Sequence, residues 1–268
     1  MKLLTINTHS LIEENYKKKL LIFADAIEEL KPDVIAMQEV NQSIEERPVK
    51  PANNFTVLGD IPLKTDNHAL NILSELGKRG VEYNLLWVGM KKSYDAYDEG
   101  IAIMSKQNID ACDEFTVSTT DDYNNWRRRK IIGLKTKNQW FYSVHLGWWG
   151  DVEEPFLMHW ERLSEKIKSK ENVWLMGDFN SEANVKDEGY STVLKFGWRD
   201  SYTEAEKKDD GYTVSGKIDG WENSDTNGKR IDYIFTNTDR QIKSSSVIFD
   251  GKNYGIISDH FGIMIETK

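Results

Sequence analysis

The sequence predicts an α/β fold in which two packed mixed sheets carry helices on their outer faces. Three segments show apolar residues at helical spacing, and they span 16–30, 68–78 and 156–167. Short apolar runs typical of strands outnumber these helices along the whole chain. A predominance of strands, with helices in both halves of the chain, favours two sheets packed together and covered by helices.

The chain opens with a strand, a helix and a second strand. Residues 3–7 form the first apolar run and residues 34–40 the second. Between them, five residues recur at helical spacing before Pro32 ends the helix: Tyr16, Leu20, Phe23, Ile27 and Leu30. Asn7 and Glu39 are therefore expected near the carboxyl ends of the two strands.

The later elements follow from the same patterns. Further strands are expected at 83–88, 101–105, 130–135, 139–145, 173–178, 231–236, 246–249 and 261–266. The polar stretch 204–229 is interpreted as a long loop, and loops of that length are often functional. Because the sequence contains no linker, low-complexity tract or short-period repeat, we expect a single domain over residues 1–268.

The composition narrows the class of protein. The 35 Lys and Arg residues are outnumbered by 44 Asp and Glu residues, for a net charge of −9. Such an acidic chain is poorly suited to binding nucleic acid, which depends on neutralising phosphates with basic residues. The single Cys112 excludes an intramolecular disulfide and favours a reducing compartment. With no signal-like or membrane-spanning apolar run, a cytoplasmic protein is expected.

The stretch from Val173 to Asn180 combines a buried strand with polar side chains at its end. A short apolar run is closed by Gly177, and Asp178 and Asn180 follow two residues apart. On an extended backbone these two side chains point the same way, which suits orienting a water or a phosphoryl oxygen. The alternative is an ordinary Asx-type turn after a strand.

Six other motifs accompany this stretch, and together they resemble a known superfamily. They are Ile6-Asn7-Thr8-His9, Met37-Gln38-Glu39-Val40, Tyr97-Asp98-Glu99-Gly100, Ser143-Val144-His145-Leu146, Arg230-Ile231-Asp232-Tyr233-Ile234 and Ser258-Asp259-His260. The ordered set resembles the endonuclease/exonuclease/phosphatase superfamily, the metal-dependent phosphoesterases related to DNase I. The resemblance runs from Asn7 to His260 and implies a four-layer α/β/β/α sandwich.

A metal site is expected around Glu39. An ionised carboxylate at the end of an apolar strand is costly unless it is paired or bound to a metal, so a salt-bridged strand end is the alternative. The resemblance implies Glu39 as the metal ligand, with Asn7 and Asp259 as supporting ligands. Oxygen ligands of this kind suit Mg²⁺, and Mn²⁺ is also possible.

Two histidine–carboxylate pairs are expected in the site. His145 has Glu99 as a candidate partner, and His260 has Asp232; either histidine can instead be a structural hydrogen-bonding residue. The resemblance implies that His260 and Asp232 act with Asp178 on the side of the attacking water. His145 and Glu99 would then bind the phosphate or assist the leaving group.

Phosphate-binding residues are expected from three segments. Asn180 and Tyr97 match family residues that contact a phosphoryl oxygen, although Tyr97 can equally be a packing aromatic. The dense basic run 126–130 precedes a strand, and the resemblance places a site arginine there. We expect Arg129 in this role, with Arg127 as the alternative. Arg128 and Lys130 are expected to face solvent.

The substrate is expected to be a sugar phosphate. Trp148 and Trp149 follow His145, and Trp126 and Trp221 lie in candidate rim segments, so their flat rings suit stacking on a sugar or a base. Local sequence around Asn7, His145 and Trp221 is similar to a bacterial subgroup described as maltose 6'-phosphate phosphatases. The expected enzyme is thus a monomeric phosphomonoesterase. A DNase I-like or abasic-site endonuclease, or a catalytically silent binding module, is the alternative.

Overall fold

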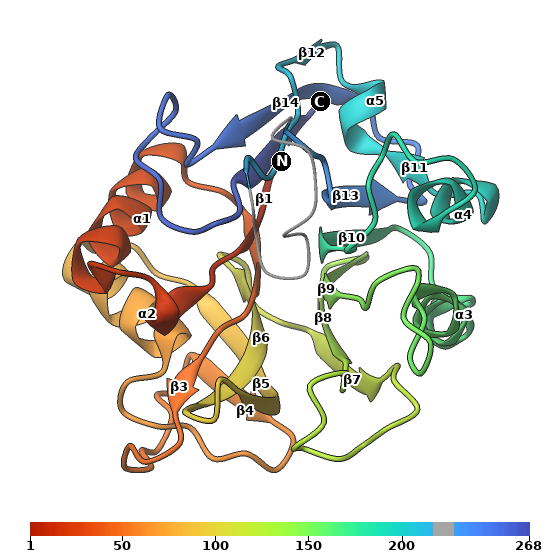
Figure 1. The fold of residues 1–268 in the computed structure, drawn as a ribbon. Coiled ribbons are helices and arrows are strands. Elements are labelled where there is room, and N and C mark those ends of the chain that lie inside the picture. Colours follow the sequence, from red (N-terminus) through yellow and green to blue (C-terminus); the bar gives the residue numbers. More distant parts are fainter. Residues whose placement is uncertain (217–227) are drawn as a thin grey trace.

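The computed structural model describes residues 1–216 and 228–268, and it shows two sheets packed face to face with helices outside them (Figure 1). The helices α1 (Tyr16–Leu30) and α2 (His68–Lys78) cover one sheet. The helices α3 (Phe156–Ile167) and α4 (Gly189–Lys195) lie on the other side of the molecule. The predicted α/β/β/α sandwich is confirmed.

The first sheet has nine strands in the part of the chain that the structure describes. Their order is β12 (Lys207–Lys208), β14 (Ile242–Ile248), β15 (Gly262–Thr267), β1 (Lys2–Asn7), β2 (Val34–Gln38), β6 (Tyr97–Ser105), β5 (Asn84–Ser93) and β4 (Phe55–Leu58), with β3 (Gln42–Ser43) paired to β6. The strands β1 and β2 are parallel, whereas β2 and β6 are antiparallel. The sheet is therefore mixed, as predicted.

The second sheet has six strands within the described ranges. Their order is β11 (Arg199–Asp200), β13 (Asp232–Thr236), β10 (Val173–Asp178), β9 (Gln139–His145), β8 (Lys130–Thr136) and β7 (Ala111–Thr116). Strand β10 runs parallel to β9 and antiparallel to β13. The short helices η1 (Ser10–Ile12) and α5 (Ser201–Glu204) complete the elements.

The central strands are apolar throughout because both of their faces are buried. In β10, Trp174 and Met176 pack between the two sheets, while Val173 and Leu175 pack beneath α3. Side chains alternate along a strand, so a strand between two apolar layers needs apolar residues at every position. Three such layers, one between the sheets and one under each set of helices, hold the sandwich together.

The pairing of these strands brings polar residues from distant parts of the sequence to one edge. Asn7 lies opposite Gln38 at the ends of β1 and β2. In the other sheet, Asp178 lies between His145 on β9 and Asp232 on β13. Parallel strands end at the same edge, so the carboxyl ends of four strands and the start of β13 surround one place.

Several elements were not predicted, and one expected loop is partly wrong. Strands β4 and β7 and helices α4 and α5 lie outside the predicted segments. Strand β12 and a bridge from Val214 to His260 occur within the expected loop 204–229. No helix in residues 1–216 and 228–268 is both long and apolar enough to cross a membrane.

Candidate active site

A pocket of about 390 Å³ opens where the strand ends of the two sheets meet. Most of the residues predicted for the site line it: Glu39, Glu99, Arg129, His145, Trp148, Asp178, Asn180, Asp259 and His260. Asp232 lies directly behind them, hydrogen-bonded to His260. The structure therefore gathers residues from nearly the whole length of the chain around one cavity.

Gly177 allows the strand carrying Asp178 to approach its neighbour. Its φ is +152°, and a Cβ atom there would lie 1.9 Å from the carbonyl oxygen of Val144. Any other residue would push β10 away from β9 and so separate Asp178 from His145, which are paired in register. The glycine that closes the apolar run is thus required by close packing at the site.

Asp178 and His260 form the buried centre of the site. The Nδ1 of His260 lies 3.0 Å from Oδ2 of Asp232, and its Nε2 lies 3.9 Å from Oδ2 of Asp178. Burial alone would lower the pKa of His260, but the charges of Asp232 and Asp178 raise it well above its usual value. Burial and the charge of Asp232 raise the pKa of Asp178 to about 7, against the effect of His260.

Strand β10 ends in a turn that carries two site residues, Asp178 and Asn180. Asn180 has a φ of +47°, and its backbone N–H donates to Oδ1 of Asp178 at 2.8 Å. The extended backbone assumed from the sequence therefore stops at Asp178, so the predicted alternation does not reach Asn180. Its side-chain amide donates to the carbonyl oxygen of Leu146 at 3.0 Å. Both Asp178 and Asn180 nevertheless line the pocket.

His145 is buried, and its pKa is shifted in the opposite direction from that of His260. Burial, together with the positive charges of Arg129 and Lys91, lowers its pKa well below the usual value, so the ring is neutral near pH 7. Its Nε2 lies 3.7 Å from Oδ2 of Asp178. Its Nδ1 is buried and has no hydrogen-bond partner among the described residues.

The predicted pairing of His145 with Glu99 is wrong. Glu99 forms an ion pair with Lys91, 3.1 Å between Oε1 and Nζ. The two residues lie opposite each other on the antiparallel strands β5 and β6. Cross-strand partners on one face approach closely, so Lys91 takes the carboxylate that the sequence motifs suggested for the histidine.

Glu39 and Asn7 link the two halves of the site. Glu39 directly follows β2 with a φ of +51°, and the side-chain amide of Asn7 donates to its Oε1 at 2.9 Å. The same amide donates to Oδ2 of Asp178 at 3.2 Å. The amide oxygen of Asn7 accepts the backbone N–H of His9 at 3.2 Å. Asn7 thus bridges Glu39 and Asp178 through its amide nitrogen, and its role as a supporting metal ligand stays a prediction.

The carboxylates of the site fit a divalent cation. Burial, followed by the charges of Glu99 and Asp259, raises the pKa of Glu39 to about 7. Such a shift reflects an excess of negative charge that a bound cation would neutralise. Oxygen donors from Glu39 and Asp259 are those that hard cations such as Mg²⁺ prefer. Among the described residues, two groups have ligand atoms close enough together to hold an ion: His9, Glu13 and Asp259, and separately Asp178, Asp232 and His260.

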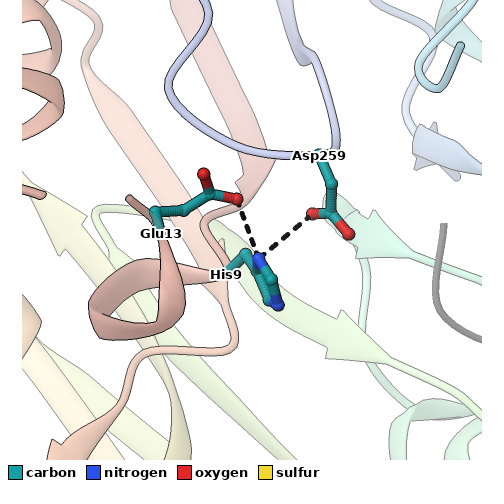
Figure 2. A group of neighbouring side chains, drawn as sticks. All are labelled: His9, Glu13 and Asp259. Atoms are coloured by element: carbon teal, nitrogen blue, oxygen red, sulfur yellow. Dashed lines mark hydrogen bonds and ion pairs between the residues drawn. The ribbon is translucent and has the colours of Figure 1, made fainter. Parts of the chain in front are cut away.

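His9 is a pocket residue that sequence reasoning left unassigned. Figure 2 shows one ring nitrogen facing both Glu13 and Asp259, with the other nitrogen pointing away from them. The Nδ1 lies 2.8 Å from Oε1 of Glu13 and 3.9 Å from Oδ1 of Asp259. Burial opposes the charged form, but Glu13, Asp259 and Glu39 raise the pKa of His9 to about 9. Its position two residues after Asn7 was the available signal.

The basic run beside the pocket divides into different roles. Arg129 is 2% exposed and lines the pocket, as predicted for a phosphate-binding residue. Arg127 turns away, pairs with Asp151 at 2.8 Å and stacks on the ring of Trp126. The expectation that Lys130 faces solvent is wrong, because its side chain is buried and ion-paired. Of this run only Lys130 lies on β8, and the arginines precede it in a turn and loop, where strand alternation does not apply.

Only some of the predicted aromatic residues reach the pocket. Trp148 lines it together with Trp126, and their rings lie 5.4 Å apart. Trp149 instead packs against Phe156 at the start of α3, so its predicted contact with substrate is not supported. Tyr97 lies at the start of β6 opposite Ser43, outside the pocket lining. Trp221 lies outside the described residues.

The comparisons with known proteins agree with this geometry. A family model described as the Endonuclease/Exonuclease/phosphatase family matches residues 4–260. A solved structure of an endonuclease/exonuclease/phosphatase family protein from Leptotrichia buccalis C-1013-b has 36% identity and a TM-score of 0.88. The match covers 100% of this chain and 99% of that one. No curated protein was found to match.

Two more distant structures share the fold. One is a mannosyl-6-phosphatase from Bacteroides thetaiotaomicron VPI-5482, with 18% identity and a TM-score of 0.64. The other is a 3' phosphatase from Neisseria bound to a product DNA hairpin, with 18% identity and a TM-score of 0.67. Each match covers 100% of this chain and 99% of the other. From the family match over residues 4–260 and the shared fold, we conclude that this chain belongs to the endonuclease/exonuclease/phosphatase family.

Proposed function

We propose that this protein is a divalent-metal-dependent phosphomonoesterase that hydrolyses a sugar phosphate, with maltose 6'-phosphate as the first candidate. The observation that carries the proposal is the division of the pocket. Buried carboxylates and histidines stand beside the buried cation Arg129, while Trp126 and Trp148 form a partly exposed aromatic wall. A terminal phosphate fits the buried groups, and a sugar fits the wall.

The residues suggest a division of labour during hydrolysis. Asp178, with a pKa near neutrality, suits accepting a proton from the attacking water. His260, kept charged by Asp232, is placed to stabilise negative charge on the phosphoryl group. Arg129 and Asn180 would bind phosphoryl oxygens, and neutral His145 would hydrogen-bond the phosphate or the leaving group.

A divalent metal would complete this arrangement. Glu39 and Asp259 are the residues that would hold it, and Asn7 keeps Glu39 in register with Asp178. A bound Mg²⁺ or Mn²⁺ would polarise the phosphoryl oxygen and stabilise charge on the leaving group.

The charge of the chain and one distant structure support a small sugar substrate. An excess of nine negative charges offers a polynucleotide no extended basic track. A single phosphate ester needs only the pocket, and salt at about 0.15 M screens the surrounding acidity beyond about 8 Å. The mannosyl-6-phosphatase of B. thetaiotaomicron shows that this fold can carry sugar phosphatase activity.

A DNA-directed phosphatase or nuclease is the second candidate, favoured by the Neisseria 3' phosphatase bound to DNA. Steady-state kcat/KM with Mg²⁺ should be compared for maltose 6'-phosphate, glucose 6-phosphate, a 3'-phosphorylated DNA hairpin and plasmid DNA. We expect the maltose ester to give the highest value. An Asp178→Asn variant that is expressed and purified in the same way controls for contaminating phosphatases. The highest value on either DNA substrate would overturn the sugar proposal, and inactivity on all four would favour a silent binding module.

The cellular setting is also a proposal. We expect the protein to be a monomer. We also expect it in the reducing cytoplasm, since the one cysteine, Cys112, is exposed and free. Size-exclusion chromatography with light scattering and cell fractionation test these two expectations.

A further inference from the structure

We propose that Lys91 is a second phosphate-binding cation and that it makes the pocket prefer phosphomonoesters to phosphodiesters. The inference rests on the proposed phosphoesterase function and extends it to a residue that none of the sequence motifs contains. Lys91 lines the pocket together with Arg129, His145 and Glu99. Its side chain is 8% exposed, which is unusual for a lysine.

An irregularity in β5 places Lys91 inside the pocket. The pairing register between β5 and β6 shifts between Gly89 and Lys91. After the shift Lys91 lies opposite Glu99, and it is buried like the residues that precede it in β5. The Nζ of Lys91 then reaches Oε1 of Glu99 at 3.1 Å and the carbonyl oxygen of Trp126 at 2.9 Å.

Arg129, which directly precedes β8, reaches the same carbonyl oxygen. Its Nη1 donates to the oxygen of Trp126 at 2.8 Å. Because both nitrogens donate to the same oxygen, Nζ of Lys91 and Nη1 of Arg129 cannot lie farther apart than the sum of their two distances to it. Burial lowers the pKa of both groups, and the charge of Arg129 lowers the pKa of Lys91 further. Both positive charges also lower the pKa of nearby His145. Two buried like charges side by side are costly unless an anion lies between them.

Some N–H donors of Lys91 and Arg129 have no acceptor among the neighbouring groups. An ammonium has three N–H donors, and the carbonyl oxygen of Trp126 accepts one of them. The contact with Oε1 of Glu99 is an ion pair, and that oxygen has no hydrogen-bond partner among the described residues. The Nε of Arg129 is buried and has no hydrogen-bond partner among the described residues. Glu99 is the carboxylate in contact with Lys91, while the negative charges of Glu39 and Asp178 act on these cations without a direct contact. The geometry thus favours an incoming anion at this wall.

The two neighbouring cations can distinguish monoesters from diesters because the two kinds of phosphate ester differ in charge. A monoester phosphate carries close to two negative charges near neutral pH, whereas a diester carries one. A diester also has a second substituent in place of one charged oxygen. Two adjacent cations therefore gain more from a monoester, and removal of Lys91 should weaken monoester hydrolysis selectively.

The test compares Lys91→Met with Lys243→Met. Lys243 is a matched control because it also forms a cross-strand pair in the same sheet, 3.0 Å from Glu266, but lies on the exposed part of β14. Steady-state kcat/KM is measured with Mg²⁺ on p-nitrophenyl phosphate and bis(p-nitrophenyl) phosphate. Lys91→Met should lower the monoester value about 10- to 100-fold, the scale of one lost charge-assisted hydrogen bond, and change the diester value little. Lys243→Met should leave both values unchanged.

Two further measurements keep the outcome decisive. Lys91→Gln keeps a hydrogen-bonding side chain beside Glu99, so it serves if Lys91→Met fails to fold, and it should show the same selective loss. Inorganic phosphate binding, followed by isothermal calorimetry with Mg²⁺, should weaken in the Lys91 variants and not in Lys243→Met. Equal losses on both esters with unchanged phosphate binding would overturn the role of Lys91. Wild-type protein that binds phosphate through Lys91 but cleaves neither ester would instead refute the proposed function.

Discussion

The imidazole of His260 is hydrogen-bonded to Asp232 through Nδ1, at 3.0 Å and fully buried. The contact fixes the ring so that its other nitrogen faces the pocket, where Asp178 also lies. Thr213 supports the arrangement from below, because its hydroxyl accepts the backbone N–H of Asp232 at 3.2 Å. The histidine and the two carboxylates therefore form one connected unit.

We predict that His260→Ala and Asp178→Ala each lower kcat by at least ~10²-fold, the scale of one positioned acid–base group. The double variant should lose far less than the product of the two, because residues that act as one unit in the same chemical step share one loss. Single-turnover rates on p-nitrophenyl phosphate give the measurement. If the two losses multiply, His260 and Asp178 do not act on the same step.

We predict that activity requires Mg²⁺ or Mn²⁺ and disappears in excess EDTA. Glu39→Gln should abolish most of the activity and the rise in melting temperature that Mg²⁺ produces, since a carboxamide is a weaker ligand for a hard cation. The same variant should melt no lower than wild type in metal-free buffer. Full turnover in EDTA contradicts the metal requirement, and a large metal-free loss of melting temperature would indicate a structural role for Glu39.

We predict that the metal-free protein gains stability from Glu39→Gln as the pH rises from about 4.5 to about 7. The pKa of Glu39 is 4.5 in its ordinary state and about 7 in the folded protein. Between these values the folded state holds a proton that the unfolded state has released, so this group lowers the free energy of unfolding as pH rises. Buried His68, whose pKa is lowered to about 3, acts in the opposite direction.

The comparison of variant with wild type isolates Glu39 from such opposing groups. Urea unfolding in EDTA at pH 5, 6 and 7 gives the difference in unfolding free energy directly. The variant's advantage should grow across this series. An advantage that shrinks or stays constant with pH would mean that the pKa of Glu39 is not raised in the folded protein.

The sequence was informative where an apolar strand ends in polar residues. Asp178 and His145 follow runs that are buried on both faces, so their position at a sheet edge could be predicted. Strand β7 was missed because it lies at the edge of its sheet and its residues are mostly half-buried or exposed, without an apolar run. Burial makes a strand visible in the sequence, whereas edge strands depend on pairing that no local pattern records.

The missed and misassigned site residues depend on tertiary geometry. Glu99 contacts Lys91 because of the register between β5 and β6, which spacing within one motif does not reveal. His9 reaches the pocket through a left-handed backbone conformation, with a φ of +46°. That conformation is uncommon for residues other than glycine and carries no signature in the sequence.

We predict that Trp148→Ala and Trp149→Ala have different effects although the residues are adjacent. Trp148 lines the pocket beside Trp126, and its indole nitrogen is buried with no hydrogen-bond partner among the described residues. It can stack on a sugar, so its loss should raise KM for maltose 6'-phosphate by about tenfold. Because p-nitrophenyl phosphate has no sugar, KM for that ester should change little.

Trp149 provides the internal control for this prediction. Its ring packs on Phe156, 6.1 Å between centroids, in the apolar layer beneath α3. Trp149→Ala should therefore destabilise the fold by about 2 kcal/mol or more, measured by urea unfolding, and leave both KM values near wild type. Should Trp149→Ala raise KM for the sugar ester while Trp148→Ala does not, the sugar-facing wall would have to lie on the Trp149 side. A rise in KM for both esters in Trp148→Ala would instead mean that this indole shapes the phosphate site.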